Sequence, residues 1–382
     1  MPEGYEVMRT RNGPAWIKSS QFQHLQQVDA IAFDCDGVLV DARRSYDATI
    51  PRVVDQLLGM ILGIDLPWKK LAPRMILDLR RTGLFNNDWD TTYALILFSL
   101  LALPLKVIRE LAASPVKIPA RRFNHSQTAT MVNIASTVRK FCSALTRSGN
   151  ASEAVDRFVK DSMANKLHDP VIAMVKERLG YPGSPPNALL STLFDEVYHG
   201  PALFRRMYDV DARHYRGKGL IENERVLVKE RDLDNANEIL EGRRLAIITG
   251  RPYLAAEHVL RSILRYFDVQ ASLFIGDIDV HPELAPRLTA FRKPSGRALT
   301  HVREALGSDM LLYVGDSAED LEMVENARLE EEPALSAGVY GTSADRSDHL
   351  KFFIDRGADL VLPTARMIPD VLRVVKDEKR AV

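Results

Sequence analysis

Short apolar runs that end in polar, glycine-containing loops recur near the start of the chain and in its last third. The clearest runs are 28–33 (VDAIAF), 245–248 (LAII) and 310–314 (MLLYV). Each has the length of a buried strand and is followed at once by polar side chains. Weaker runs predict further strands at 271–275, 335–339 and 360–362.

Segments with helical periodicity separate these runs. They predict helices over 234–243, 254–264, 294–306 and 318–327. Strands that alternate with helices indicate a doubly wound α/β fold, a Rossmann-like parallel sheet with right-handed crossovers. Ligands bind at the carboxyl ends of the strands in such sheets, so the loops after the apolar runs are where a site is expected.

The stretch from residue 43 to 232 has a different pattern. Its apolar residues recur at helical spacing, as in Ile50, Val53, Val54, Leu57 and Leu58. Helix-start signals occur at Asn150 and at Asp169-Pro170. We therefore predict an N-terminal extension at 1–27, an α/β core domain at 28–42 and 233–382, and a large helical domain at 43–232, inserted after the first strand.

Three features of the helical stretch need separate interpretation. Residues 114–126 are proline-rich and basic, which is typical of a loop or flexible insertion, and 181–187 (YPGSPPN) predict a turn. The apolar run at 94–108 is shorter than the ~20 residues of a membrane-spanning helix, and Pro104 and Lys106 interrupt it. We predict that this run is a buried helix.

Composition narrows the function classes. The 382 residues contain 51 Lys plus Arg and 51 Asp plus Glu, so the formal net charge is zero. Such a balance gives no long-range attraction to nucleic acid or to an anionic membrane. The two cysteines, Cys35 and Cys142, do not form a disulfide framework, and the N-terminus lacks a signal-peptide pattern. These observations predict a cytoplasmic protein whose partner is a small molecule.

Candidate catalytic side chains follow the predicted strands in chain order. They are Asp34 and Asp36 with Gly37, then Thr249 and Gly250, then Lys293, then Asp316 and Asp320. Their surroundings read IAFDCDGVLVD, AIITGRP, FRKPSG and LYVGDSAED. Together these segments resemble the four motifs of the haloacid dehalogenase (HAD) superfamily. A D-x-D pair alone is a weak signal, but four elements in order at strand ends are a strong one.

The resemblance implies a magnesium-dependent phosphatase in which Asp34 attacks phosphorus and forms an aspartyl-phosphate. The groups themselves support this chemistry, because a carboxylate and a phosphomonoester dianion repel each other unless a cation lies between them. Asp34, Asp316 and the main-chain carbonyl of Asp36 offer the oxygen ligands that Mg²⁺ prefers. Residues i and i+2 of an extended segment share a side, so Asp36 can act as general acid and base beside Asp34.

The remaining motif residues have roles around the phosphate. We expect the Thr249 hydroxyl and the Gly250 N–H to donate to phosphate oxygens, and Lys293 to pair with the phosphate and with Asp34. Gly37 permits a turn and the close approach of backbone N–H groups to the phosphate. Asp320 lies one turn after Asp316, where it could hold a metal-bound water or Lys293.

Each of these residues also has a structural interpretation when it is taken alone. Asp316 and Ser317 could cap the helix that follows them, and Thr249 could cap the helix that starts near Tyr253. Lys293 could be an ordinary surface lysine. Only the catalytic interpretation explains why all the motifs follow strands.

In the HAD superfamily an insertion after the first motif is a cap. A helical cap at this place is similar to subfamily I, type A, which includes phosphoglycolate phosphatases, although this insertion is longer than usual. Residues 79–93 resemble a subgroup related to those phosphatases, and there we predict substrate contacts for Arg80, Asn86 and Asn87. The alternative is that Asn87 or Asp88 caps a helix that starts near Trp89, with the arginines solvated.

The expected function is therefore hydrolysis of a small phosphorylated metabolite with Mg²⁺, by a monomer or homodimer and without nucleic acid or membrane partners. A phosphomutase of the β-phosphoglucomutase type uses the same two aspartates and stays open as an alternative. A non-catalytic phosphometabolite-binding protein on this fold is a second alternative, although a binder has no need for Asp36.

Overall fold

A computed structural model describes residues 4–10, 12–63, 68–85, 87–104, 106, 108, 127–145, 150–162, 168–242, 244–343 and 345–380. The described residues form two compact units: residues 1–42 with 224–382, and residues 43–223. The first is an α/β unit and the second is helical. The division into domains made from the sequence, with its second boundary at 232/233, stays a prediction.

The α/β unit is built from short strands and helices in alternation. Its strands are β1 (Tyr5–Thr10), β2 (Gly13–Lys18), β3 (Ala30–Phe33), β4 (Val40–Asp41), β5 (Arg225–Val226), β6 (Leu245–Thr249), β7 (Leu273–Phe274), β8 (Leu311–Gly315), β9 (Ala334–Val339) and β10 (Leu360–Leu362). Its α-helices are α1 (Phe22–Leu25), α10 (Glu230–Ile239), α11 (Tyr253–Leu260), α12 (Asp277–Val280), α13 (Ala285–Leu288), α14 (Arg297–Leu306), α15 (Ala318–Leu329), α16 (Arg346–Asp355) and α17 (Ile368–Arg380).

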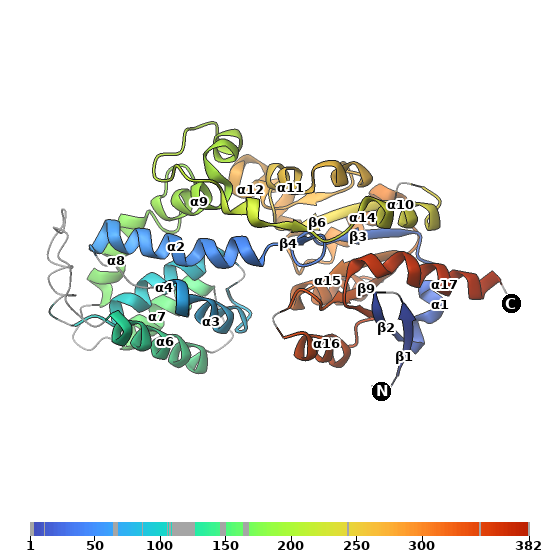
Figure 1. The fold of residues 1–382 in the computed structure, drawn as a ribbon, viewed down its shortest axis with the longest axis horizontal. Coiled ribbons are helices and arrows are strands. Elements are labelled where there is room, and N and C mark those ends of the chain that lie inside the picture. Colours follow the sequence, from blue (N-terminus) through green and yellow to red (C-terminus); the bar gives the residue numbers. More distant parts are fainter. Residues whose placement is uncertain are drawn as a thin grey trace. The chain divides into compact units, whose positions relative to one another are not determined.

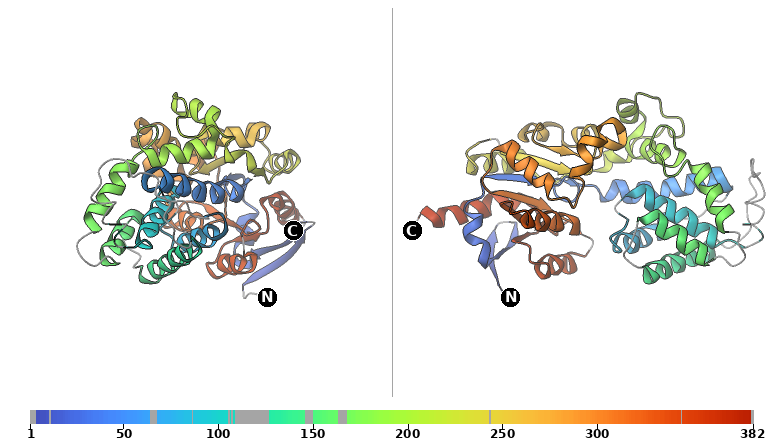
Figure 2. Two further views of the ribbon diagram at one scale, coloured as in Figure 1. Left: turned by 60° about the vertical axis from the view of Figure 1, so that its left-hand side comes forward. Right: turned by 180° about the vertical axis from the view of Figure 1, so that it is seen from behind.

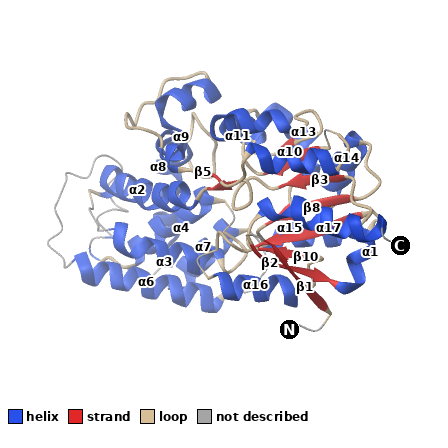
Figure 3. Cartoon of the chain, turned by 45° about the vertical axis from the view of Figure 1, so that its right-hand side comes forward, coloured by secondary structure: helices blue, strands red, loops and turns tan. Residues whose placement is uncertain are grey.

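Within the described residues, eight strands form one sheet in the order β1-β2-β10-β9-β8-β3-β6-β7. The strands from β10 to β7 run parallel, and β1 and β2 are antiparallel at one edge. After β3 the chain builds outward through β6 and β7, and then returns to place β8 on the other side of β3. Figure 3 shows β3 and β8 side by side. This strand order is Rossmann-like, and the place where it reverses, between β3 and β8, is where such sheets bind ligands. The α/β fold with a mostly parallel sheet is confirmed.

Helices cover both faces of this sheet, and the alternation of side chains in the strands explains why. Ile31 and Phe33 of β3 belong to the apolar core that includes residues of α10, α11 and α17. Ala30 and Ala32 face the other core, which includes residues of α14 and α15. Because both faces are buried, the central strands β3, β6 and β8 are almost continuous apolar runs in the sequence.

The N-terminal segment is an ordered part of the sheet. β1 and β2 form an antiparallel hairpin, and β2 pairs with β10, so the first and last segments of the chain lie side by side (Figures 1 and 2). Ala15 and Ile17 point into the core and are buried. No strand was predicted within the N-terminal extension at 1–27, because this edge strand buries only alternate residues and lacks a continuous apolar run.

Helices are the regular secondary structure of the described residues in the second unit. Its helices are α2 (Arg43–Leu62), α3 (Trp68–Arg80), α4 (Asp88–Leu101), α6 (Gln127–Ala144), α7 (Ala151–Ser162), α8 (His168–Leu179) and α9 (Leu189–Tyr208). Every residue of α4 from Thr91 to Leu100 is buried, which confirms a buried helix in the apolar run. None of the described helices is both long enough and apolar enough to cross a membrane. The turn predicted at 181–187 is present, and 114–126 lies outside the described residues.

Candidate active site

Two neighbouring parallel strands place the first and last motifs together. The register of β3 and β8 pairs Phe33 with Val314, and the Asp34 N–H donates to the carbonyl of Val314 at 2.8 Å. Asp34 therefore leaves β3 beside the residues that leave β8, which are Gly315 and Asp316. This juxtaposition follows directly from the sheet topology.

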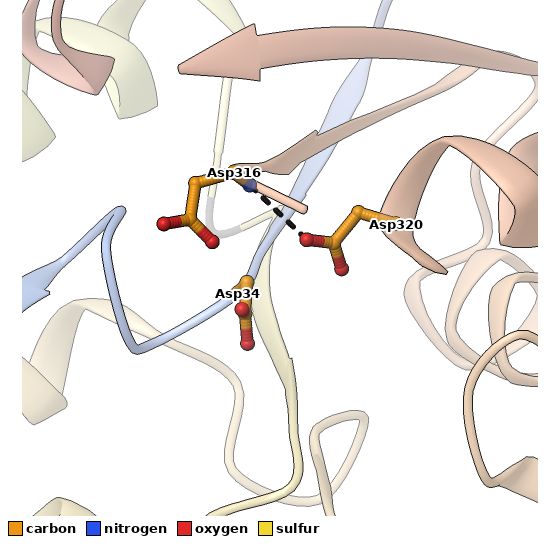
Figure 4. Close-up of side chains that lie close together, drawn as sticks. All are labelled: Asp34, Asp316 and Asp320. Carbon is orange, nitrogen blue, oxygen red and sulfur yellow. Dashed lines mark hydrogen bonds between the residues drawn. The ribbon is translucent and has the colours of Figure 1, made fainter. Parts of the chain in front are cut away.

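Asp34, Asp316 and Asp320 form a compact acidic cluster at this end of the sheet. One carboxylate oxygen from each lies within 4.8 Å of the others. Figure 4 shows Asp34 on the segment that follows β3, and Asp316 and Asp320 on the segment that runs from β8 into α15. Three carboxylates at such a distance repel one another unless cations compensate them.

Lys293 supplies part of that compensation. Its Nζ lies 2.9 Å from Oδ1 of Asp34 and 2.7 Å from Oδ1 of Asp320, and its side chain is only 12% exposed. Burial lowers the pKa of this ammonium, but Asp320 and Asp34 more than offset that effect and hold the pKa well above its usual value. The interpretation of Lys293 as an ordinary surface lysine is wrong.

Asp320 is the most fully hydrogen-bonded member of the cluster. Its Oδ1 accepts from Lys293 and, at 2.8 Å, from the Tyr313 hydroxyl. Its Oδ2 accepts from the backbone N–H groups of Asp316 and Ser317 and from the Ser317 hydroxyl. Burial raises the pKa of Asp320, but Lys293 and these hydrogen bonds outweigh it, so the pKa is below its ordinary value. Ser317 and Asp320 also form the capping box of α15, so the capping interpretation is confirmed for Ser317.

Asp34 and Asp316 are in the opposite electrostatic situation. Burial raises the pKa of Asp34 to about 7; Lys293 acts against this, while Asp320 and Asp36 add to it. Burial, with Asp34 and Asp320 next, also raises the pKa of Asp316 well above its usual value. No described residue donates a hydrogen bond to the Asp316 carboxylate. The cluster therefore carries more negative charge than Lys293 balances.

Gly37 makes room for Asp316. A Cβ at this position would lie 1.7 Å from Oδ2 of Asp316, and its φ of +77° also favours glycine. The Gly37 N–H donates to the carbonyl of Val40 at 2.8 Å, and its carbonyl accepts from the Thr342 hydroxyl at 3.0 Å. The structure thus gives Gly37 a steric role, and its N–H already has a partner within its own loop.

Asp36 lies next to the cluster and is held by a buried arginine. Its Oδ1 accepts from Nη2 of Arg251, and the Asp36 side chain is 34% exposed. Arg251 also donates from Nη1 to Oε2 of Glu224 at 2.8 Å. Asp36 is thus close to Asp34 along the chain, yet its carboxylate is held by a different cation from the one that holds Asp34.

Thr249 and Gly250 end β6, next to β3 in the sheet. Thr249 is 1% exposed, and its hydroxyl accepts from the backbone N–H of Arg251 at 3.2 Å, which leaves its own proton to donate. The first backbone N–H of α11, on Tyr253, donates to Asp277 instead. The alternative that Thr249 caps α11 is therefore wrong. Gly250 is exposed, with nothing within 4 Å of where a Cβ would be.

Two of the three residues predicted to contact substrate in the helical unit, Arg80 and Asn87, have structural partners there. Arg80 pairs with Asp47 at 2.7 Å and with Asp88 at 3.0 Å. The Asn87 side chain accepts from the Trp89 N–H at 2.8 Å and caps α4. Asn86 lies outside the described residues. Substrate binding by these residues stays a prediction.

Three residues around the motif side chains were not predicted from the sequence. Arg251 contacts Asp36, Tyr313 contacts Asp320, and Glu224 holds Arg251. Arg251 follows Thr249-Gly250 directly, so its place next to a motif was a signal. Tyr313 was visible only as an apolar strand residue, and its hydroxyl reaches Asp320 because residues 313 and 320 face each other across the β8–α15 turn. Nothing in the local sequence distinguishes Glu224, because its partner is 27 positions away.

Comparisons with known proteins support the fold. No protein-family model matches the chain, and no curated protein matches it significantly. A solved structure from the Northeast Structural Genomics Consortium, target ZR25, aligns with 92% of this chain and all of its own, with a TM-score of 0.62 and 19% identity. A phosphatase, Tt82 from Thermococcus thioreducens, aligns over 82% of this chain and 94% of its own, with a TM-score of 0.49 and 21% identity. At such identities the first likeness concerns the fold.

Proposed function

We propose that the chain is a magnesium-dependent phosphatase of the HAD type that hydrolyses a small phosphomonoester through an aspartyl-phosphate on Asp34. The observation that carries the proposal is the cluster of Asp34, Asp316 and Asp320 at the carboxyl ends of β3 and the β8–α15 turn, with Lys293 between Asp34 and Asp320. A purely structural cluster would balance its charges. This one leaves excess negative charge at the edge where parallel sheets bind ligands.

The side chains present fit a divalent cation. Asp316 and Asp34 supply hard oxygen donors, as Mg²⁺ requires. Burial, with Asp34 and Asp320 next, raises the pKa of Asp316, and a bound cation would act against all three effects. We assign Asp34, Asp316 and the main-chain carbonyl of Asp36 as ligands. The Asp320 carboxylate is already occupied by hydrogen bonds, so we assign it to holding Lys293 and the Asp316 loop instead of direct coordination. When bound, the metal would offset the charge between nucleophile and phosphate.

Asp34 is the nucleophile in this proposal. Its contacts with Lys293 and with the Cys35 N–H both involve Oδ1, and no described residue donates to Oδ2. Attack by Asp34 on phosphorus breaks the bond to the leaving oxygen, which takes a proton from Asp36. Asp36, now a carboxylate, takes a proton from water as the water oxygen attacks the aspartyl-phosphate. Phosphate and the free Asp34 carboxylate result.

Thr249, Gly250 and Lys293 would hold the phosphoryl group in place. The Thr249 hydroxyl has a proton to donate, and the Gly250 N–H lies on the same loop after β6. Lys293 already neutralises part of the charge on Asp34, and can share its ammonium protons with a phosphate oxygen. Such preorganised donors stabilise the charge that develops in phosphoryl transfer.

We also propose that the helical unit is a cap domain that selects the substrate. It is one continuous insertion, and the two chain segments at its ends pair as the antiparallel ribbon of β4 and β5, with Val40 opposite Val226. A paired ribbon makes the two connections one structural element. In this proposal Mg²⁺ and a small phosphorylated metabolite are the partners.

Phosphate release from a panel of small phosphomonoesters, with and without Mg²⁺, tests the proposal. We expect Mg²⁺-dependent release that Asp36→Ala reduces by about 10²-fold or more. A sugar phosphate that isomerises without phosphate release would instead indicate a phosphomutase. Tight binding of phosphorylated compounds without any turnover would indicate a binding protein.

A further inference from the structure

Arg251 is a charged side chain with no exposed surface, and it joins two carboxylates of the α/β unit. We propose that Arg251, held in turn by Glu224, is the positioning residue for the general acid and base Asp36. This inference rests on the proposed function, because it assigns a partner to Asp36 within that mechanism. Arg251 itself does not touch substrate, since its side chain is 0% exposed.

The geometry fixes the guanidinium in two directions. Nη1 donates to Oε2 of Glu224 at 2.8 Å, and Nη2 contacts Oδ1 of Asp36. A guanidinium is planar and rigid, so two carboxylates on its two Nη atoms determine its orientation. The Asp36 carboxylate is thereby held at a defined place, although its side chain is 34% exposed and would otherwise rotate freely.

Burial differs between the two partners of Arg251. The Glu224 side chain is 0% exposed, so this ion pair is desolvated, and losing one of its two charges would be costly for the other. Asp36 is the exposed partner and thus the one that can meet substrate and water. Glu224 and Arg251 form a buried, fixed ion pair, and this pair holds the Asp36 carboxylate in place.

Glu224 also comes from an informative place in the chain. It directly precedes β5, at the point where the chain returns from the helical unit to the α/β unit. Asp36 lies on the other side of the same β4–β5 ribbon, and its backbone bridges to Val40 of β4. Asp36 is therefore held in two ways: through its own loop, and through Glu224 and Arg251 at the point where the chain returns to the α/β unit.

The role predicts a selective kinetic defect. Formation of the aspartyl-phosphate from p-nitrophenyl phosphate needs no proton donor, because p-nitrophenolate leaves as a stable anion. Hydrolysis of the aspartyl-phosphate does need Asp36 as a base, whatever the leaving group was. A variant with a misplaced Asp36 should therefore release one equivalent of p-nitrophenolate in a burst and then turn over slowly.

The test uses the full chain with Mg²⁺ and two matched substrates, p-nitrophenyl phosphate and phenyl phosphate. Removing only Arg251 would take the guanidinium away from a buried carboxylate, Glu224, so the main variant is Arg251→Met combined with Glu224→Gln. We expect a burst, steady-state turnover of p-nitrophenyl phosphate that is about 10²-fold slower, and a still larger loss with phenyl phosphate. Arg251→Lys keeps the positive charge but loses the second nitrogen that contacts a carboxylate. Its steady-state turnover rate should lie between that of the double variant and that of the natural protein.

Two reference variants make the result decisive. Asp36→Asn defines the signature of a lost acid and base, and Arg366→Ala removes a different ion pair of the same unit, with Asp232, at the start of α17. Arg366→Ala should show no burst and the same ratio of rates for the two esters. If Asp36→Asn gives the burst but the Arg251 and Glu224 variants slow both esters equally, or not at all, the inference is overturned while the proposed function stands. If the natural protein releases no phosphate from either ester, the proposed function fails first.

Discussion

The two ends of β3 carry the same residue type in opposite electrostatic states. Asp29 precedes the strand and Asp34 follows it. Asp29 accepts hydrogen bonds from the Ser308 hydroxyl at 2.6 Å and from the Met310 N–H at 3.1 Å, and it pairs with Arg244 at 2.5 Å. Burial raises the pKa of Asp29, but these partners outweigh it, so its pKa is below the ordinary value. The pKa of Asp34 is raised to about 7.

The contrast separates a structural carboxylate from a functional one. Donors surround Asp29, so its charge contributes to stability and ties β3 to the loop before β8. Asp34 lies among other carboxylates, so its charge costs free energy unless something is bound there. Clustered carboxylates without enough positive partners, as at the carboxyl end of the sheet, indicate a ligand-binding site. Asp29, at the amino end of β3, has enough partners and gives no such indication.

The largest effect should come from Asp34→Asn. We expect phosphate release to fall by at least about 10³-fold, because an amide is not a nucleophile toward phosphorus. Thermal unfolding should stay cooperative, since the change removes one of several like charges. Asp29→Asn is the matched control on the same strand and should keep kcat within about threefold. Activity retained by Asp34→Asn would refute the aspartyl-phosphate mechanism.

Asp316→Asn should next change the response to magnesium. Losing one ligand should raise the Mg²⁺ concentration needed for half-maximal activity by at least about tenfold, and excess Mg²⁺ should restore part of the rate. Without metal the same variant should unfold at the same or a higher temperature, because burial, with Asp34 and Asp320 next, disfavours a charged carboxylate at this position and raises the pKa of Asp316. A titration of activity with Mg²⁺ measures the first effect, and scanning calorimetry without Mg²⁺ measures the unfolding temperature. If Asp316→Asn unfolded at a lower temperature than the natural protein, both without Mg²⁺, the excess of negative charge in the acidic cluster would be contradicted.

Asp29→Asn should produce the reverse pattern, a loss of stability that depends on pH. At pH 7 we expect it to cost about 1–3 kcal/mol, the range for hydrogen bonds to a charged group. Because the folded-state pKa of Asp29 is lowered, its contribution is fully present above the unfolded value of about 4 and is lost as the pH falls through the folded value. Urea unfolding at pH 7 and below pH 4 should show the difference between the two proteins shrink. If the two proteins differed equally in free energy of unfolding at both pH values, the stabilising effect of the ionised Asp29 carboxylate would be contradicted.

The same contrast explains what could be read from the sequence. Asp34, Thr249 and Asp316 were predictable because each ends or directly follows a strand, and the sheet brings strand ends together. Arg251 and Glu224 were not, because their pairing depends on the return of the chain after the helical unit. The N-terminal hairpin was missed for a related reason: β2 becomes a strand only when β10 is beside it.

The helical unit contains charged groups that match the Asp29 pattern. Arg80 lies between Asp47 and Asp88, and Lys176 pairs with Asp156. Asp156 also accepts from the Tyr93 hydroxyl at 2.6 Å. These charges have opposite partners at hand, so they hold helices together in the way that Asp29 holds its loop. The sequence pattern of 79–93 could not distinguish such pairs from substrate contacts, because the partner Asp47 is 33 positions from Arg80.

Asn87 gives the smallest effect and decides between these two interpretations within the helical unit. Its side chain caps α4 at the Trp89 N–H, so Asn87→Ala should cost about 1 kcal/mol of stability. Asn87→Asp keeps a capping oxygen and should restore that stability. If the role of Asn87 is to cap helix α4, Asn87→Asp also keeps the KM for the phosphomonoester that the protein hydrolyses. A KM raised tenfold or more in Asn87→Asp, with unfolding unchanged, would instead place Asn87 among the residues that bind substrate.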